Sequence, residues 1–162
     1  MSDVVLYATD TMADWEYGYL VAGLAMAGRP LRVLGAPGVT EVRTMGGLRV
    51  LVDGPVTEAG DVAALVLPGA GTWESGHDEA LDLARRALSN GTTVAGICGA
   101  TFGLARAGLL DDRAHTSNAP DYLAASGDRG ASLYRDEKVV TDRHLITAPA
   151  TAPIDFARAL FE

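Results

Sequence analysis

The sequence has very little cysteine and no long hydrophobic run. Cys98 is the single cysteine in 162 residues, so no internal disulfide can form and nothing requires an oxidising compartment. No apolar run approaches the roughly 18 residues that a transmembrane helix needs. The short apolar run at the N-terminus follows Asp3 rather than a basic stretch, so we expect no signal peptide. These absences predict a cytoplasmic protein with no membrane partner.

Basic residues are also scarce. Lys and Arg number 13 against 21 Asp and Glu, which gives a net charge of −8. A nucleic-acid-binding surface needs a basic patch that releases counterions, so we expect no nucleic-acid partner. One cysteine and three scattered histidines lack the spacing of zinc ligands, so we also expect no metal site.

The remaining composition predicts one globular α/β domain over residues 1–162. Almost half of the residues are apolar and 21% are charged, and this length suits one sizeable core. Apolar strand-like runs occur at residues 4–8, 31–36, 62–67, 92–97 and 145–148, with shorter candidates at 42–45, 48–52, 133–134 and 139–141. Helical spacing occurs at residues 13–27, 78–89, 119–125 and 154–161, and also directly after Cys98.

Strands that alternate with helices indicate parallel βαβ units. The main strands are apolar without alternation, which is typical of a sheet covered on both faces. We therefore predict a flavodoxin-like, doubly wound and mostly parallel sheet sandwiched by helices. Functional sites of such folds lie at the carboxyl ends of the strands. Residues 9–16, residues 68–77 and the turn at Cys98 would meet at that edge.

Cys98 stands where a nucleophile would be placed. It falls on the joint between the apolar strand and the following helix, and its neighbours Gly96, Gly99 and Ala100 are small. A sharp strand-to-helix turn crowds the backbone and needs small neighbours, which is the logic of a nucleophile elbow. We expect strained backbone angles at Cys98, and a lowered thiol pKa because of the helix N-terminus.

Glu16 is the first candidate partner of Cys98. It follows the first strand, in the first turn of a helix, at the same predicted edge of the sheet as Cys98. A carboxyl group beside a thiol has a raised pKa and can share a proton with the sulfur. Asp14 is the alternative acid, although helix capping explains it adequately.

The stretch Pro68-Gly69-Ala70-Gly71-Thr72 is a glycine-rich loop after a strand. It lacks the Gly-Lys-Ser/Thr of a phosphate loop and the dinucleotide fingerprint, so we expect no cofactor. Backbone amides here could hold an oxyanion formed at Cys98, and Gly71 and Gly99 are the candidate donors.

Three histidines could supply a base. His115 lies in a polar loop after the Cys98 helix that can fold back over the elbow, and it is the best candidate. His77 begins a helix beside the glycine-rich loop and is an alternative approach to Cys98. His144 lies in a strand hairpin and is expected to be structural.

Together these landmarks resemble the ThiJ/PfpI superfamily, which includes the parkinsonism-associated DJ proteins and belongs to the class I glutamine amidotransferase-like fold. The resemblance covers nearly the whole chain and rests on residues 14–16, 67–73, 95–100, 107–110, 115–118 and 151–156. It implies that Cys98 is the reactive cysteine, that Glu16 is its protonated partner, and that Gly71 and Gly99 supply amides. PfpI-type peptidases carry a histidine directly after the cysteine, whereas Gly99 stands here.

The resulting hypothesis is a cysteine-dependent hydrolase or lyase-like enzyme. The Cys98 thiolate would attack a small carbonyl or amide-like substrate, as in a peptidase, glyoxalase or amidotransferase-like reaction. The alternative is a non-enzymatic oxidative-stress sensor or chaperone whose Cys98 is oxidised to a sulfinate. The resemblance also implies a homodimer, with Trp15 or Trp73 partly exposed.

Overall fold

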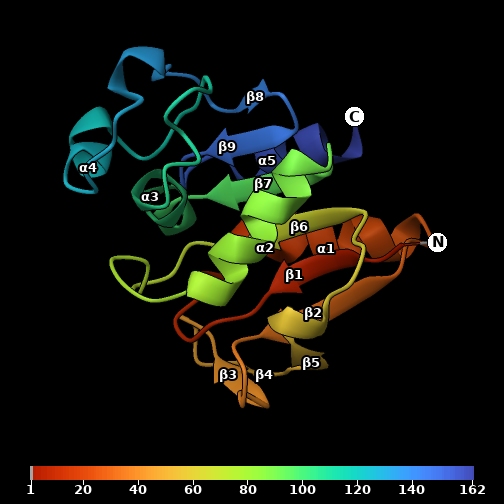
Figure 1. Cartoon of the computed structure of the whole chain (residues 1–162). Coiled ribbons are helices and arrows are strands. Elements are labelled where there is room, and N and C mark those ends of the chain that lie inside the picture. The colour runs from red at the N-terminus through yellow and green to blue at the C-terminus, as the bar shows by residue number, and fades with distance from the viewer. Residues whose placement is uncertain (1) are drawn as a thin grey trace.

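The computed structural model describes residues 2–162 and shows alternating strands and helices (Figure 1). The strands are β1 (Val4–Tyr7), β2 (Leu31–Gly35), β3 (Glu41–Arg43), β4 (Arg49–Leu51), β5 (Gly54–Pro55), β6 (Ala64–Leu67), β7 (Thr93–Ile97), β8 (Val140–Asp142) and β9 (Leu145–Ala148). The helices are α1 (Asp14–Met26), α2 (Asp78–Ser89), α3 (Gly99–Arg106), α4 (Pro120–Ala124) and α5 (Pro153–Phe161), with short 3-10 turns η1 (Val56–Glu58) and η2 (Ala131–Leu133).

Seven of the strands form one sheet in the order β5-β2-β1-β6-β7-β9-β8. Every pair is parallel except β8 with β9, which form an antiparallel hairpin. The strands β3 and β4 form a separate antiparallel hairpin. This arrangement confirms the predicted flavodoxin-like α/β fold.

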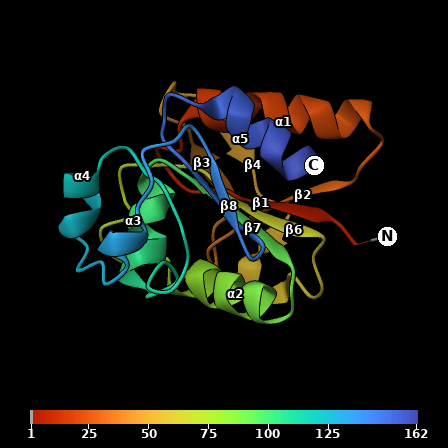
Figure 2. The ribbon, with the colours of Figure 1, turned by 90° about the horizontal axis from the view of Figure 1, so that it is seen from above.

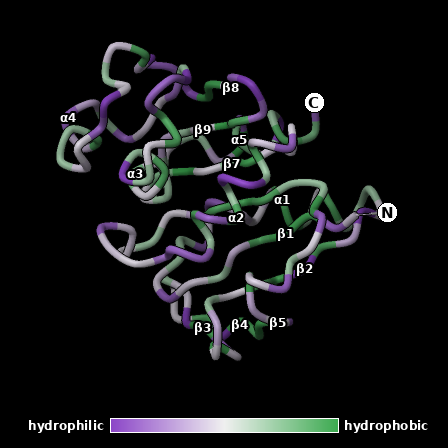
Figure 3. The backbone as a smooth tube through the Cα atoms, in the orientation of Figure 1, coloured by the Kyte–Doolittle hydropathy of each residue, from purple (hydrophilic) through white to green (hydrophobic). Residues whose placement is uncertain are grey.

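Two hydrophobic clusters cover the two faces of the sheet. Because side chains alternate along a strand, Val5 and Leu65 pack with α2 and α3, whereas Val4 and Val66 pack with α1 and α5. Figure 2 shows these two helix layers on opposite sides of the strands. The strands β1, β6, β7 and β9 are hydrophobic along their length in Figure 3, as a sheet covered on both faces requires.

Some local predictions are wrong. Residues 133–134 do not form the predicted strand: Leu133 ends η2, where its N–H donates to the Gly130 carbonyl, and Tyr134 makes an isolated β-bridge with His115. Trp73 is 1% exposed rather than partly exposed, while Trp15 is 47% exposed. Within residues 2–162, no helix combines the length and the apolar character needed to cross a bilayer.

Candidate active site

Cys98 occupies the predicted elbow. It links β7 to α3 with φ 55° and ψ −122°, angles that a non-glycine residue rarely adopts, which confirms the expected strain. Its glycine neighbours are needed for space. A Cβ on Gly96 would lie 2.6 Å from Leu104 Cδ1, and one on Gly99 would lie 2.8 Å from the Ala70 carbonyl oxygen. The sharp bend between β7 and α3 therefore directs the Cys98 sulfur toward the loops at the carboxyl ends of the strands.

Glu16 lies beside Cys98, as predicted. Its side chain projects from the first turn of α1, is 1% exposed, and accepts the Gly69 N–H at 2.7 Å through Oε2. A Cβ on Gly69 would meet both Cys98 Cβ and Glu16 Oε2 at 2.7 Å, so only a glycine leaves room for this contact. Oε1 is buried with no hydrogen-bond partner among the described residues.

The pKa of Glu16 is raised to about 7, chiefly by burial. The Gly69 N–H and the neighbouring Cys98 thiol act in the opposite direction and lower it. Glu16 can therefore hold a proton near neutral pH, which a carboxyl group with an ordinary pKa cannot do. This is the property expected of an acid that exchanges a proton with a thiol.

The Cys98 thiol does not have the lowered pKa expected from the helix N-terminus. Burial, together with the nearby Glu16 carboxyl group, raises its pKa to about 11, although Asn118 and the Gly99 amide lower it. That expectation is wrong because desolvation penalises the thiolate more than the nearby donors stabilise it. The resting form is a thiol, and thiolate must be produced by proton transfer.

Asn118 is a site residue that the sequence argument missed. Its Nδ2 donates to Cys98 Sγ at 3.2 Å, and its Oδ1 accepts the Ala150 N–H at 2.9 Å. The polar loop at residues 115–118 was the available signal in the sequence, and its histidine was the residue predicted to approach Cys98. The structure turns the asparagine of that loop, rather than the histidine, toward the sulfur.

The two predicted oxyanion donors are placed differently. The Gly99 amide follows Cys98 directly and lowers the pKa of its thiol. The prediction for Gly71 is wrong, because its N–H already donates to Thr11 Oγ1 at 2.9 Å. In the same loop, Ala70 N lies 3.2 Å from where a Cβ on Gly99 would stand, and its N–H has no acceptor within residues 2–162. Ala70 and Gly99 are thus the candidate amide pair.

The hairpin of β3 and β4 is attached to the start of α1, at the same end of the sheet as Cys98. Asp14 Oδ2 accepts the Gly46 N–H at 2.7 Å, and Thr44 holds the pKa of Asp14 below its ordinary value through a hydrogen bond. Asp14 does not cap α1, since that helix has no side-chain cap. It fastens the hairpin to the segment that carries Glu16.

The structure does not bring His115 to Cys98. Its ring is fully buried, with Nδ1 2.8 Å from the Arg113 carbonyl oxygen, Nε2 3.5 Å from Asp128 Oδ2, and Tyr134 packed edge-on. The prediction that this ring points at Cys98 is wrong, because its loop turns Asn118 to the sulfur instead.

The other two histidines are also placed elsewhere. His77 bonds to the Tyr7 hydroxyl and to Thr72, and it stacks on Trp73 at 4.2 Å between ring centroids. Burial lowers its pKa. His144 lies in the turn between β8 and β9 with φ 70°. No cluster of metal-ligating side chains occurs among residues 2–162.

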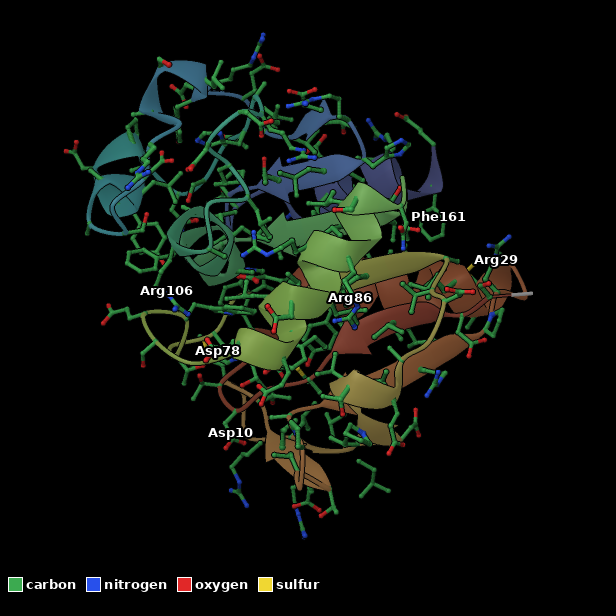
Figure 4. The ribbon with its side chains drawn as sticks, in the orientation of Figure 1. Asp10, Arg29, Asp78, Arg86, Arg106 and Phe161 are labelled. Atoms are coloured by element: carbon green, nitrogen blue, oxygen red, sulfur yellow. The ribbon has the colours of Figure 1, made fainter. Side chains whose placement is uncertain are left out.

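The site lies at one end of the sheet, and a separate cavity lies at the other. Figure 4 labels Asp10, which follows β1, and Arg106 at the carboxyl side of the strands, with Arg29 and Phe161 at the opposite side. A cavity of about 360 Å³ is lined by Arg29 and Phe161 together with the starts of β1, β6 and β7. This cavity is therefore not part of the Cys98 site.

Comparisons with known proteins agree with the fold described above. The uncharacterized protease YoaZ of Bacillus subtilis (strain 168) is 41% identical over 167 residues, covering 95% of this chain and 79% of that protein. A thiJ/pfpI family protein from Bacillus anthracis superposes with a TM-score of 0.92 at 38% identity, covering 99% of this chain and 81% of that one. A DJ-1 superfamily protein from Agrobacterium tumefaciens has a TM-score of 0.91 at 34% identity, with 99% and 88% covered. Since the DJ-1/PfpI family model matches residues 2–162, this chain belongs to the DJ-1/PfpI family.

Proposed function

We propose that this protein is a cysteine-dependent enzyme that attacks a small carbonyl or amide-like substrate through Cys98. The observation that carries the proposal is the buried Glu16 carboxyl group, which borders the same glycine as Cys98 at a strained elbow. Backbone strain of this kind costs roughly 1–3 kcal/mol and persists where the surrounding structure imposes it. A purely structural cysteine needs neither these backbone angles nor a buried carboxyl partner.

The groups around the sulfur can complete an addition to a carbonyl carbon. The Glu16 carboxylate takes the thiol proton, and the sulfur lone pair forms the new C–S bond while the C=O π electrons move to oxygen. In this proposal the Gly99 and Ala70 N–H groups hold that oxygen anion. With an aldehyde, Glu16 then returns its proton to the oxygen and leaves a thiohemiacetal. With an amide, Glu16 protonates the leaving nitrogen as the C–N bond breaks, and water then hydrolyses the acyl-thioester and frees the thiol. Neither branch needs an external oxidant or reductant.

The amide-like branch of the proposal draws on the name of one relative, an uncharacterized protease. The site lacks a histidine beside Cys98, because Gly99 follows the cysteine and His115 bonds to other groups. Without a histidine base, the proton is handled by Glu16 alone. This favours activated small substrates, such as a 2-oxoaldehyde, over ordinary peptide bonds, whose leaving amine needs a strong general acid.

The test is a turnover assay with two probe classes, a 2-oxoaldehyde and a fluorogenic aminoacyl amide. We expect turnover of one class by the wild type and its loss in Cys98→Ser and Glu16→Gln. Glu58→Gln, at an exposed position in η1, is the matched control and should keep full activity. Turnover that survives in Cys98→Ser, or no turnover of either class, would refute the proposal.

A further inference from the structure

The side chain of Asn118 has only one possible orientation. The Ala150 backbone N–H can only donate, so the atom that faces it at 2.9 Å must be the amide oxygen of Asn118. The NH2 group of Asn118 consequently faces Cys98 Sγ at 3.2 Å. A flipped amide would place two donors together and leave the sulfur facing an oxygen.

Ala150 also makes a second hydrogen bond, through its other backbone group. Its carbonyl oxygen accepts the Trp15 indole N–H at 2.9 Å, and Trp15 directly precedes Glu16 in α1. The segment that orients Asn118 is therefore tied to the helix that carries the acid. One connected set of contacts thus fixes both polar partners of Cys98.

An amide donor behaves differently from a histidine at this position. It does not titrate, so it can neither remove the thiol proton nor lose its own N–H as the pH changes. Hydrogen bonds from a neutral donor are stronger when the acceptor is charged. The Asn118 N–H therefore stabilises the thiolate more than the thiol at every pH. The titratable groups whose charges interact with Cys98 are Glu16 and Tyr122.

We propose that Asn118 is a catalytic residue, a fixed donor that stabilises the Cys98 thiolate, and that Trp15 positions it through the backbone of Ala150. This role rests on the proposed function, in which Glu16 moves the proton and Asn118 stabilises the charge left on sulfur. Glu16 and Asn118 thus divide proton transfer and charge stabilisation between them, whereas a histidine beside the sulfur could perform both.

The test measures the rate of Cys98 alkylation by iodoacetamide between pH 6 and pH 10, which requires no substrate turnover. Asn118→Ala removes the donor and should slow alkylation roughly tenfold at pH 8. Asn118→Asp keeps the shape but puts a carboxylate oxygen against the sulfur, so it should be slower still, with the rate profile shifted to higher pH. Trp15→Phe keeps an aromatic ring at this position but loses the indole N–H, and it should slow alkylation less than Asn118→Ala does.

Asn90→Asp is the matched control, since Asn90 lies at the C-terminal end of α2 and its substitution changes the net charge equally. It should alkylate at the wild-type rate. The proposal is overturned if Asn118→Ala matches the wild type at every pH, or if Asn90→Asp slows alkylation as much as Asn118→Asp. Because alkylation is read without a substrate, a failure here is distinct from a failure to find turnover.

Discussion

Replacing Glu16 with Gln should stabilise the folded protein at alkaline pH while removing the proton transfer on which substrate turnover at Cys98 depends. The substitution keeps an oxygen that can accept the Gly69 N–H and removes only the ability to ionise. The folded-state pKa of Glu16 is about 7, against an ordinary value of 4.5. Because folding raises this pKa, the stability associated with it is full below about pH 4.5 and is lost as the pH rises to 7.

The size of this effect follows from the shift. At about 1.4 kcal/mol per pKa unit, the rise from 4.5 to about 7 corresponds to ~3 kcal/mol. The side chain is 1% exposed, so solvent screening reduces this figure little. We expect Glu16→Gln to exceed the wild type in unfolding free energy by about 3 kcal/mol at pH 8, and to equal it near pH 4.

Urea unfolding of both proteins at pH 4.5, 6 and 8 measures the difference directly. Glu58→Gln, on the exposed 3-10 turn, is the control and should show no pH-dependent difference from the wild type. A Glu16→Gln difference that stays constant from pH 4.5 to pH 8 would show that Glu16 titrates normally. The reasoning about its burial would then be wrong.

The same variant should change the reactivity of the thiol. The Glu16 charge raises the Cys98 pKa, after the larger contribution of burial, and one pKa unit changes the thiolate fraction about tenfold at a pH below the pKa. Removing the charge should therefore speed iodoacetamide alkylation at pH 8 by roughly tenfold. Identical alkylation profiles for the wild type and Glu16→Gln would contradict the coupling between the two groups.

Three further outcomes are expected. Graded peroxide should add two oxygens to Cys98, because no second cysteine is present to form a disulfide; intact mass and peptide mapping, with Cys98→Ser as control, check this. Gly103→Ala should destabilise the fold by about 1–3 kcal/mol in urea unfolding, since its Cβ would lie 2.3 Å from Trp73 Cε3. We propose that the protein dimerises through the exposed Trp15 and Tyr19 on α1. Sedimentation should show a dimer, and Tyr19→Glu should weaken it. A wild-type monomer at high micromolar concentration would refute this proposal.

The sequence by itself determined the fold class and the central pair of the site. Continuous apolar strands that alternate with helical spacing leave few arrangements other than a parallel sheet covered on both faces. Small residues around Cys98 mark a sharp strand-to-helix turn, and in such sheets the loop that carries Glu16 meets that turn. These conclusions depend on local periodicity and on the order of strands and helices, both of which can be inferred from the order of residues in the sequence.

Only the tertiary structure decided which polar groups complete the site. Asn118 and His115 stand three residues apart in one polar loop, and the path of that loop over the elbow turns the first to the sulfur and buries the second against Asp128. Gly71 loses its donor role to Thr11, a contact between segments 60 residues apart. The raised Cys98 pKa likewise depends on burial by distant segments. Hydrogen-bond partners and desolvation arise from three-dimensional packing, which no local pattern of residues records.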